Sequence, residues 1–140
     1  GNPSIYSPAN TVMADLFQHI TDLCEMCRQA GTGNVVISPG SRNAPLIDAF
    51  YRCFGEEQCF SMVDERSAAY FALGMARTSG RPSVLICTSG TAVLNYAPAL
   101  AEAYYQKIPL LAITADRPAE LIDQQDNQTI RQEGVYRNFI

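Results

Sequence analysis

The stretch 61-SMVDERSAAYFALGMA-76 passes from an apolar segment through three charged residues into a run of small residues. A short apolar segment that gives way to small residues at helical spacing is typical of a buried strand leading into a helix. Asp64 stands where a side chain caps such a helix, and Glu65 falls in its first turn. Gly or Asn would serve a plain surface turn equally well. The charges therefore indicate that this strand end faces a functional site.

The rest of the chain repeats this pattern of strand and helix. The predicted strands are 34-NVVIS-38, 58-QCFSMV-63, 83-SVLICT-88 and 109-PLLAIT-114, and the predicted helices are Asn10 to Gln29, Ala44 to Phe54, Arg66 to Thr78 and Ala92 to Gln106. Continuous apolar strands that alternate with helices indicate a parallel sheet covered on both faces. We therefore predict a single α/β domain over residues 1–140, doubly wound, with a mainly parallel sheet and helices on both faces. We expect the chain to reach Ile140 as a continuing helix.

The composition limits the class of partner. The 140 residues are 47% hydrophobic and 17% charged, which is ordinary for a globular domain with a buried core. A net charge of −4 offers no clustered cations for nucleic acid. The longest apolar runs are too short to span a bilayer, and the N-terminal residues lack the basic-then-apolar pattern of a signal peptide. We expect a cytoplasmic protein with no nucleic-acid or membrane partner.

The five cysteines are an odd number, which argues against a disulfide framework. Cys24 and Cys27 form a CxxC pair, which is compatible with a redox pair or half of a zinc site. They also continue the apolar spacing of the first helix, which favours two core residues. Zinc would have to recruit Cys53 and Cys59, whose spacing is unusual for ligands. The single histidine, His19, is expected at the surface of that helix or in its packing, so a Ser-His hydrolase is not supported.

Polar residues concentrate at one edge of the predicted sheet. The segments after the strands are 38-SPGSRN-43, 64-DERS-67, 88-TSGT-91 and 114-TADRP-118, whereas the segments before the strands are the ordinary turns 31-GTG-33, 55-GEEQ-58 and 79-SGRP-82. In open parallel sheets, ligands lie beyond the carboxyl ends of the strands, near helix N-termini that favour anions. We therefore predict the functional site at this edge.

Several residues at this edge allow both a structural and a functional interpretation. Glu65 either complements a helix dipole or is a functional carboxylate whose proton a partner uses. Pro39-Gly40 predicts a tight turn, and Arg42 follows at a helix start, where a cation opposes the dipole unless an anion binds there. Asn127 and Gln128 lie in a stretch rich in amides, which is either a solvated loop or a set of hydrogen-bond partners for a polar ligand.

Five motifs, taken in order, resemble one enzyme family. They are 38-SPGSRNAPL-46, 64-DERSAAYFALGMA-76, 87-CTSGTAVLNYAPALAEA-103, 114-TADRP-118 and 127-NQTIRQ-132. Together they resemble the N-terminal, pyrimidine-binding domain of the 2-succinyl-5-enolpyruvyl-6-hydroxy-3-cyclohexene-1-carboxylate synthases, the thiamine diphosphate enzymes of the menaquinone pathway. The resemblance runs from about Thr11 to Tyr136. One motif such as TSGT is weak, but all of them in this order and spacing are specific.

The resemblance implies an activity and two cofactors. Members of the family decarboxylate 2-oxoglutarate and add the succinyl unit to isochorismate in a 1,4-addition, with thiamine diphosphate and Mg²⁺ as cofactors. Glu65 matches the family's catalytic glutamate, which hydrogen-bonds the pyrimidine ring of the cofactor and promotes its imino tautomer. That imine then removes the thiazolium C2 proton. A carboxyl partner for the cofactor would explain the charge at this strand end.

The resemblance also assigns site residues. The positions implied to bind substrate are Ser41, Arg42, Arg117, Asn127 and Gln128, and the positions implied to line the pyrimidine pocket with Glu65 are Pro39 and Asn95. Isochorismate and 2-oxoglutarate are dicarboxylates, which suits arginine rather than lysine at such points. Many relatives have an acidic residue after NQTI, where this chain has Arg131, so no role is assigned to that position.

The resemblance covers only part of such an enzyme. The chain contains no GDG followed by a downstream Asn, the pattern that holds Mg²⁺ and the diphosphate, so we expect no metal ligands in it. We interpret it as an N-terminal domain without the middle and diphosphate-binding domains, inactive alone, from an enzyme that is a homo-oligomer. Two alternatives stay open. One is another thiamine diphosphate enzyme, of the acetohydroxyacid synthase or 2-oxo-acid decarboxylase type, and the other is a non-catalytic doubly wound binding domain.

Overall fold

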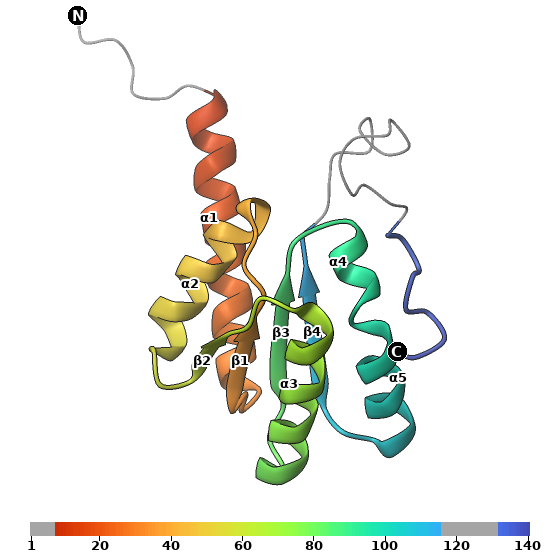
Figure 1. The fold of residues 1–140 in the computed structure, drawn as a ribbon. Coiled ribbons are helices and arrows are strands. Elements are labelled where there is room, and N and C mark those ends of the chain that lie inside the picture. Colours follow the sequence, from red (N-terminus) through yellow and green to blue (C-terminus); the bar gives the residue numbers. More distant parts are fainter. Residues whose placement is uncertain (1–7, 116–131) are drawn as a thin grey trace, which may run out of the picture.

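A computed structural model of the chain describes residues 8–115 and 132–140, with side chains from residue 15 onward in the first helix (Figure 1). Its elements are α1 (Pro8–Gln29), β1 (Asn34–Ile37), the 3-10 helix η1 (Ser41–Asn43), α2 (Ala44–Phe54), β2 (Cys59–Ser61), α3 (Glu65–Ser79), β3 (Ser83–Cys87), α4 (Thr91–Leu94), α5 (Ala97–Gln106) and β4 (Leu110–Thr114). Most predicted boundaries lie within two residues of these.

The four strands form one parallel sheet in the order β2-β1-β3-β4. Val36 of β1 lies opposite Phe60 of β2 on one side and Leu85 of β3 on the other. The chain adds β2 on one side of β1 and then adds β3 and β4 on the other, so the winding direction reverses between β1 and β3. Parallel α/β sheets bind ligands at such a switch point, beyond the carboxyl ends of the strands.

Alternate residues of the two central strands supply two separate cores. Those that face α1 and α2 are Val35, Ile37, Val84 and Ile86, and those that face α3, α4 and α5 are Val36, Leu85 and Cys87. Each of these side chains is at most 1% exposed, and burial of an aliphatic side chain of this size stabilises the fold by about 1.5–3 kcal/mol. Figure 1 shows α1 and α2 on one face of the sheet and α3, α4 and α5 on the other. The predicted doubly wound α/β fold is confirmed.

The single helix predicted from Ala92 to Gln106 is in fact two helices. α4 ends at Leu94, and α5 begins at Ala97 with a proline in its first turn. Because Pro98 has no N–H, it cannot continue the hydrogen-bond ladder from α4. Tyr96 lies at the break and is fully buried. The break therefore places a phenol inside the core directly beside Asn95.

The C-terminal residues form turns rather than the predicted helix. Residues 133–138 are turns, and Gly134 adopts a left-handed φ of +70°, which interrupts a helix. Val135 and Tyr136 pack against the core of α4 and α5, and the hydroxyl of Tyr136 donates a hydrogen bond to the carbonyl of Val93. The C-terminal turn is thus anchored beside α4.

The segments that precede the strands tie the opposite edge of the sheet together. Arg81 donates from Nε to the carbonyl of Gly31 at 3.0 Å and from Nη2 to the carbonyl of Thr32 at 3.3 Å. Gln58 donates from Nε2 to the carbonyl of Gly33 at 3.0 Å. These polar side chains therefore satisfy backbone carbonyls of the adjacent turn, which is a structural use.

The CxxC cysteines are core residues, as predicted. Cys24 is 2% exposed and Cys27 4% exposed, and both lie between α1 and the sheet. Burial raises the pKa of Cys24 to about 12 and raises the pKa of Cys27, so both remain neutral thiols. Within the described residues, no group of three or more His, Cys, Asp or Glu side chains is placed to hold a metal ion. In the same residues, no helix combines the length and hydropathy of a membrane span.

Candidate active site

The segment after β1 approaches the segment after β3 very closely. Gly40 is in extended backbone, and a Cβ built on it would lie 2.6 Å from Cβ of Thr88. Only glycine fits at that distance. The turn itself falls one residue later than predicted, in η1, which begins at Ser41. The two segments therefore meet at the switch point of the sheet.

Asn43 holds the segment after β1 in place. Its side chain is fully buried, with Oδ1 accepting from the backbone N–H of Gly40 at 2.8 Å and Nδ2 donating to the carbonyl of Ser38 at 3.0 Å. A buried amide with both ends satisfied fixes the local backbone geometry. Asn43 is a structural residue of the edge that sequence reasoning missed, although it stands inside the quoted SPGSRN motif.

The adjacent carboxylates of Asp64 and Glu65 have different uses. Asp64 is the N-cap of α3, and its side chain accepts from the backbone N–H of Ser67 at 2.8 Å, as predicted. Glu65 is the first residue of the helix, partly buried, and its carboxylate makes no hydrogen bond or ion pair with any residue that the structure describes. Asp64 already caps α3, so helix capping does not explain why a second carboxylate stands at Glu65.

Glu65 lies near the end of β3 and the break between α4 and α5. Burial raises the pKa of the Cys87 thiol to about 12, and the charge of Glu65 adds to this rise. Burial also raises the pKa of Tyr96 well above its ordinary value, with further contributions from Cys87 and Glu65. The hydroxyl of Tyr96 lies beside the Cys87 thiol, but the two groups do not meet the distance and angle of a hydrogen bond. A carboxylate, a thiol and a phenol thus gather at the carboxyl edge.

The segment after β3 is tied to the end of β4. Gly90 has φ 82° and ψ −142°, a conformation open to glycine, and its N–H donates to Oε1 of Gln132 at 2.6 Å. Nε2 of Gln132 donates to the carbonyl of Ala115 at 3.0 Å, and the N–H of Ala115 donates to the carbonyl of Cys87 at 3.2 Å. Sequence reasoning also missed Gln132, which ends the quoted NQTIRQ motif.

The predicted site residues are placed as follows. Pro39, Ser41 and Arg42 lie in the segment after β1, and their side chains are exposed. Asn95 is the exposed C-cap of α4, and its Nδ2 donates to the carbonyl of Thr91 at 3.3 Å. The remaining predicted positions, Arg117, Asn127, Gln128 and Arg131, lie outside the described residues.

The edge suits the pyrimidine half of a thiamine cofactor. The aminopyrimidine ring offers hydrogen-bonding nitrogens, and Glu65 presents a carboxylate with no partner among the described residues. Two buried oxygens at this edge, Oγ of Ser38 and the hydroxyl of Tyr96, also lack a hydrogen bond within the described residues, and so does Oγ of Ser83 at the other end of β3. Buried polar atoms without partners are costly unless a ligand or water satisfies them. The partly buried carboxylate of Glu65, which can accept or share a proton with a ring nitrogen, therefore fits the ring.

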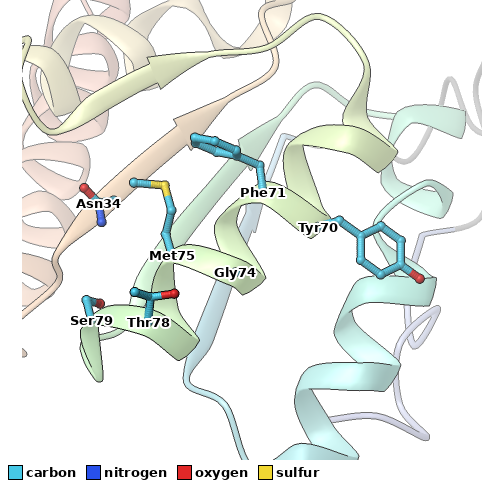
Figure 2. Close-up of a pocket in the computed structure, with 7 residues that line it drawn as sticks. All are labelled: Asn34, Tyr70, Phe71, Gly74, Met75, Thr78 and Ser79. Carbon is cyan, nitrogen blue, oxygen red and sulfur yellow. The ribbon is translucent and has the colours of Figure 1, made fainter.

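Two grooves formed by described residues lie away from this edge. One, of about 600 Å³, follows the second half of α3 and reaches Asn34 at the start of β1 (Figure 2). Figure 2 shows the rings of Tyr70 and Phe71 pointing away from one another on α3. The other, of about 640 Å³, lies between α1 and α2. Neither contains Glu65 or Arg42.

The comparisons with known proteins define the class. The family model for the N-terminal TPP binding domain of thiamine pyrophosphate enzymes matches residues 19–135. The match covers all four strands and the whole described carboxyl edge except the end of the C-terminal turn. The chain therefore belongs to this family of thiamine diphosphate-binding domains.

Within this family, the chain is similar to enzymes of one particular name. Curated proteins named 2-succinyl-5-enolpyruvyl-6-hydroxy-3-cyclohexene-1-carboxylate synthase are similar to this chain in several bacteria. The Desulfotalea psychrophila protein is 54% identical over 123 residues, which are 88% of this chain and 23% of the relative. The Cytophaga hutchinsonii protein is 56% identical over 119 residues, which are 85% of this chain and 21% of the relative. The Porphyromonas gingivalis protein is 54% identical over 121 residues, which are 86% of this chain and 21% of the relative.

These findings confirm the resemblance drawn from the five motifs. They do not favour a synthase or decarboxylase of another thiamine diphosphate type, nor a domain without chemistry. The chain spans less than a quarter of the length of the curated relatives it matches, because those shares are 21–23%.

Proposed function

We propose that this chain is the N-terminal, pyrimidine-binding domain of a thiamine diphosphate-dependent transferase that decarboxylates 2-oxoglutarate and adds the succinyl-semialdehyde unit to isochorismate in menaquinone biosynthesis. The observation that carries the proposal is Glu65, a carboxylate at the carboxyl edge that makes no hydrogen bond or ion pair with any described residue. The similarity to synthases of this name along nearly the whole chain supports the choice of reaction.

Glu65 is the proposed catalytic residue. Thiamine diphosphate, when bound, supplies a carbon nucleophile that stabilises the charge left by decarboxylation. Glu65 would hydrogen-bond the ring nitrogen of the pyrimidine and hold a proton there, which is a general acid–base role. Pro39 and Asn95, on the segment after β1 and at the break after α4, would line the same ring.

Arg42 and Ser41 are proposed to bind a substrate carboxylate. Both side chains are exposed beside the switch point, and the guanidinium of Arg42 makes no ion pair with a described residue. Charge-assisted hydrogen bonds from arginine suit a dicarboxylate. The sequence motifs add Arg117, Asn127 and Gln128 to this proposed substrate set.

The rest of the site is proposed to come from further domains. The relatives are several times longer than this chain, and Mg²⁺ with the diphosphate would be held by a diphosphate-binding domain outside it. We propose a homo-oligomeric, cytoplasmic enzyme. Tyr70 and Phe71 are 42% and 41% exposed on α3, which is consistent with a helix face that another domain or subunit covers.

The proposal is tested by assaying the full-length protein with thiamine diphosphate, Mg²⁺, isochorismate and 2-oxoglutarate. We expect consumption of 2-oxoglutarate that depends on isochorismate, with no turnover of pyruvate. Turnover of pyruvate in its place would identify an acetohydroxyacid synthase or a decarboxylase. No turnover of either 2-oxo acid would leave the binding-domain alternative.

The isolated 140-residue chain provides a second test. We expect it to bind thiamine diphosphate weakly and to lack turnover, because half of the proposed site is missing. If the isolated chain alone consumed 2-oxoglutarate with isochorismate, the division of the site between domains would be wrong.

A further inference from the structure

Gln132 joins two strand ends that are distant in the sequence. Its Oε1 accepts from the N–H of Gly90, 42 residues away, and its Nε2 donates to the carbonyl of Ala115, 17 residues away. The two bonds are 2.6 Å and 3.0 Å long, and the amide is partly buried. One side chain therefore links the turn after β3 to the end of β4.

This bond network continues across the switch point. Gly90 belongs to the same segment as Thr88, and Thr88 packs against Gly40 so closely that no Cβ fits. Asn43 in turn holds Gly40 by its backbone N–H. A contiguous set of contacts thus runs from the segment after β1, through the turn after β3, to the end of β4.

The position of Gln132 is itself anchored. The hydroxyl of Tyr136, four residues on, donates to the carbonyl of Val93, and Val135 packs on the same core. The amide is therefore held by the C-terminal turn, while its two partners belong to the sheet edge. A change at residue 132 acts on the edge without removing a side chain from either core.

We propose that Gln132 is a positioning residue for the thiamine diphosphate site. It acts through Gly90: by accepting from that N–H, it holds the turn after β3 in its glycine-only conformation, and this turn belongs to the segment that packs against Gly40 at the switch point. The inference rests on the proposed function for its effect on turnover, but the clamp itself is a property of this chain.

The clamp is tested first on the 140-residue chain, by amide hydrogen exchange followed by NMR. In Gln132→Ala we expect the Gly90 amide to exchange at least roughly tenfold faster, the factor that corresponds to one net hydrogen bond. Gln132→Glu retains an acceptor oxygen for the Gly90 N–H but loses the donor to the Ala115 carbonyl, so it should restore only part of the protection. Glu133→Gln, a change at the exposed neighbour, is the matched control. Unchanged exchange at Gly90 in Gln132→Ala would show that the clamp does not form.

The same variants are then compared in the full-length enzyme. Misplacement of a site by about 1 Å costs on the order of 100-fold in rate, so we expect kcat/KM of Gln132→Ala to fall roughly 10- to 100-fold. Gln132→Glu keeps only the acceptor for Gly90 and should recover part of the activity, and Glu133→Gln should equal the wild type. If Gln132→Ala turned over substrate at the wild-type rate, the positioning role would be wrong. The same would follow if Gln132→Glu regained protection at Gly90 and no activity. An inactive wild-type enzyme would instead count against the proposed function and leave the exchange result standing.

Discussion

The two edges of the sheet use their polar side chains differently. At the edge where the strands begin, Arg81 donates two hydrogen bonds to carbonyls of the turn before β1. At the edge where the strands end, Arg42 is exposed and makes no ion pair with a described residue, and Glu65 makes no hydrogen bond with one. Both edges carry an arginine, but only Arg81, at the edge where the strands begin, donates hydrogen bonds to described backbone carbonyls.

This difference separates stability from function. A side chain that satisfies a backbone carbonyl has a reason to be present without any ligand. A carboxylate and a guanidinium that make no hydrogen bond or ion pair with a described residue remain available to a ligand, and ligands of parallel α/β sheets bind at the carboxyl edge. The contrast recurs between neighbours, because Asp64 caps α3 while Glu65 does not.

The largest expected effect is at the carboxyl edge. Glu65→Gln in the full-length enzyme should lower kcat by about 10²–10⁴-fold, the usual contribution of a positioned acid–base group. The unfolding midpoint should stay nearly the same, because no described hydrogen bond is lost. The matched control is Asp64→Asn, which keeps an oxygen acceptor for the N–H of Ser67 and should retain most activity. If Glu65→Gln and Asp64→Asn lost activity equally, the assignment of a catalytic role to Glu65 and a capping role to Asp64 would be wrong.

The two arginines give the next contrast. Arg42→Ala should raise the KM for a dicarboxylate substrate roughly 10- to 100-fold, because a hydrogen bond to a charged group contributes about 1.5–3 kcal/mol. Arg81→Ala should leave KM unchanged and lower the free energy of unfolding by about 1–2 kcal/mol, because two hydrogen bonds from its guanidinium to backbone carbonyls are lost. Steady-state kinetics and urea unfolding of both variants provide the check, and the reverse pattern would contradict the assignment of the edges.

Two glycines test the close approach at the switch point. Gly40→Ala should lower the free energy of unfolding by about 1–3 kcal/mol, because its Cβ would lie 2.6 Å from Cβ of Thr88 and the segments must separate. Gly74→Ala, in α3 with no atom within 4 Å of the added Cβ, should raise it by about 0.5–1 kcal/mol. Denaturant unfolding measures both. If Gly74→Ala lowered the free energy of unfolding, or if Gly40→Ala left it unchanged, the contacts described for these two glycines would be wrong.

The smallest expected effect concerns the cap of α3. The hydrogen bond from Ser67 lowers the pKa of Asp64 below its ordinary value in the folded protein. A group with a lowered folded pKa stabilises the fold above its unfolded pKa, near 3.9, and the contribution is lost as the pH falls through the folded pKa. The gap in unfolding midpoint between wild type and Asp64→Ala should therefore narrow as the pH drops below about 4. A gap that is constant over this range would argue against the cap.

The strands and the sheet edge could be predicted because both follow from local patterns. Apolar runs such as 83-SVLIC-87 mark buried parallel strands, and polar segments after them mark the carboxyl edge. The break after Asn95 escaped prediction, because the apolar spacing continues through it and only Pro98 signals it. Asn43 and Gln132 escaped too, because their partners are set by turn geometry and by tertiary contacts up to 42 residues away in the chain.

The central claim is that Glu65 is present for the cofactor rather than for the fold. The most direct test is the exchange of the C2 proton of bound thiamine diphosphate for deuterium, measured by acid quench and NMR in the full-length enzyme. We predict that Glu65→Gln slows this exchange by at least about 100-fold while the cofactor stays bound and the domain stays folded. Exchange at the wild-type rate in Glu65→Gln would contradict the claim.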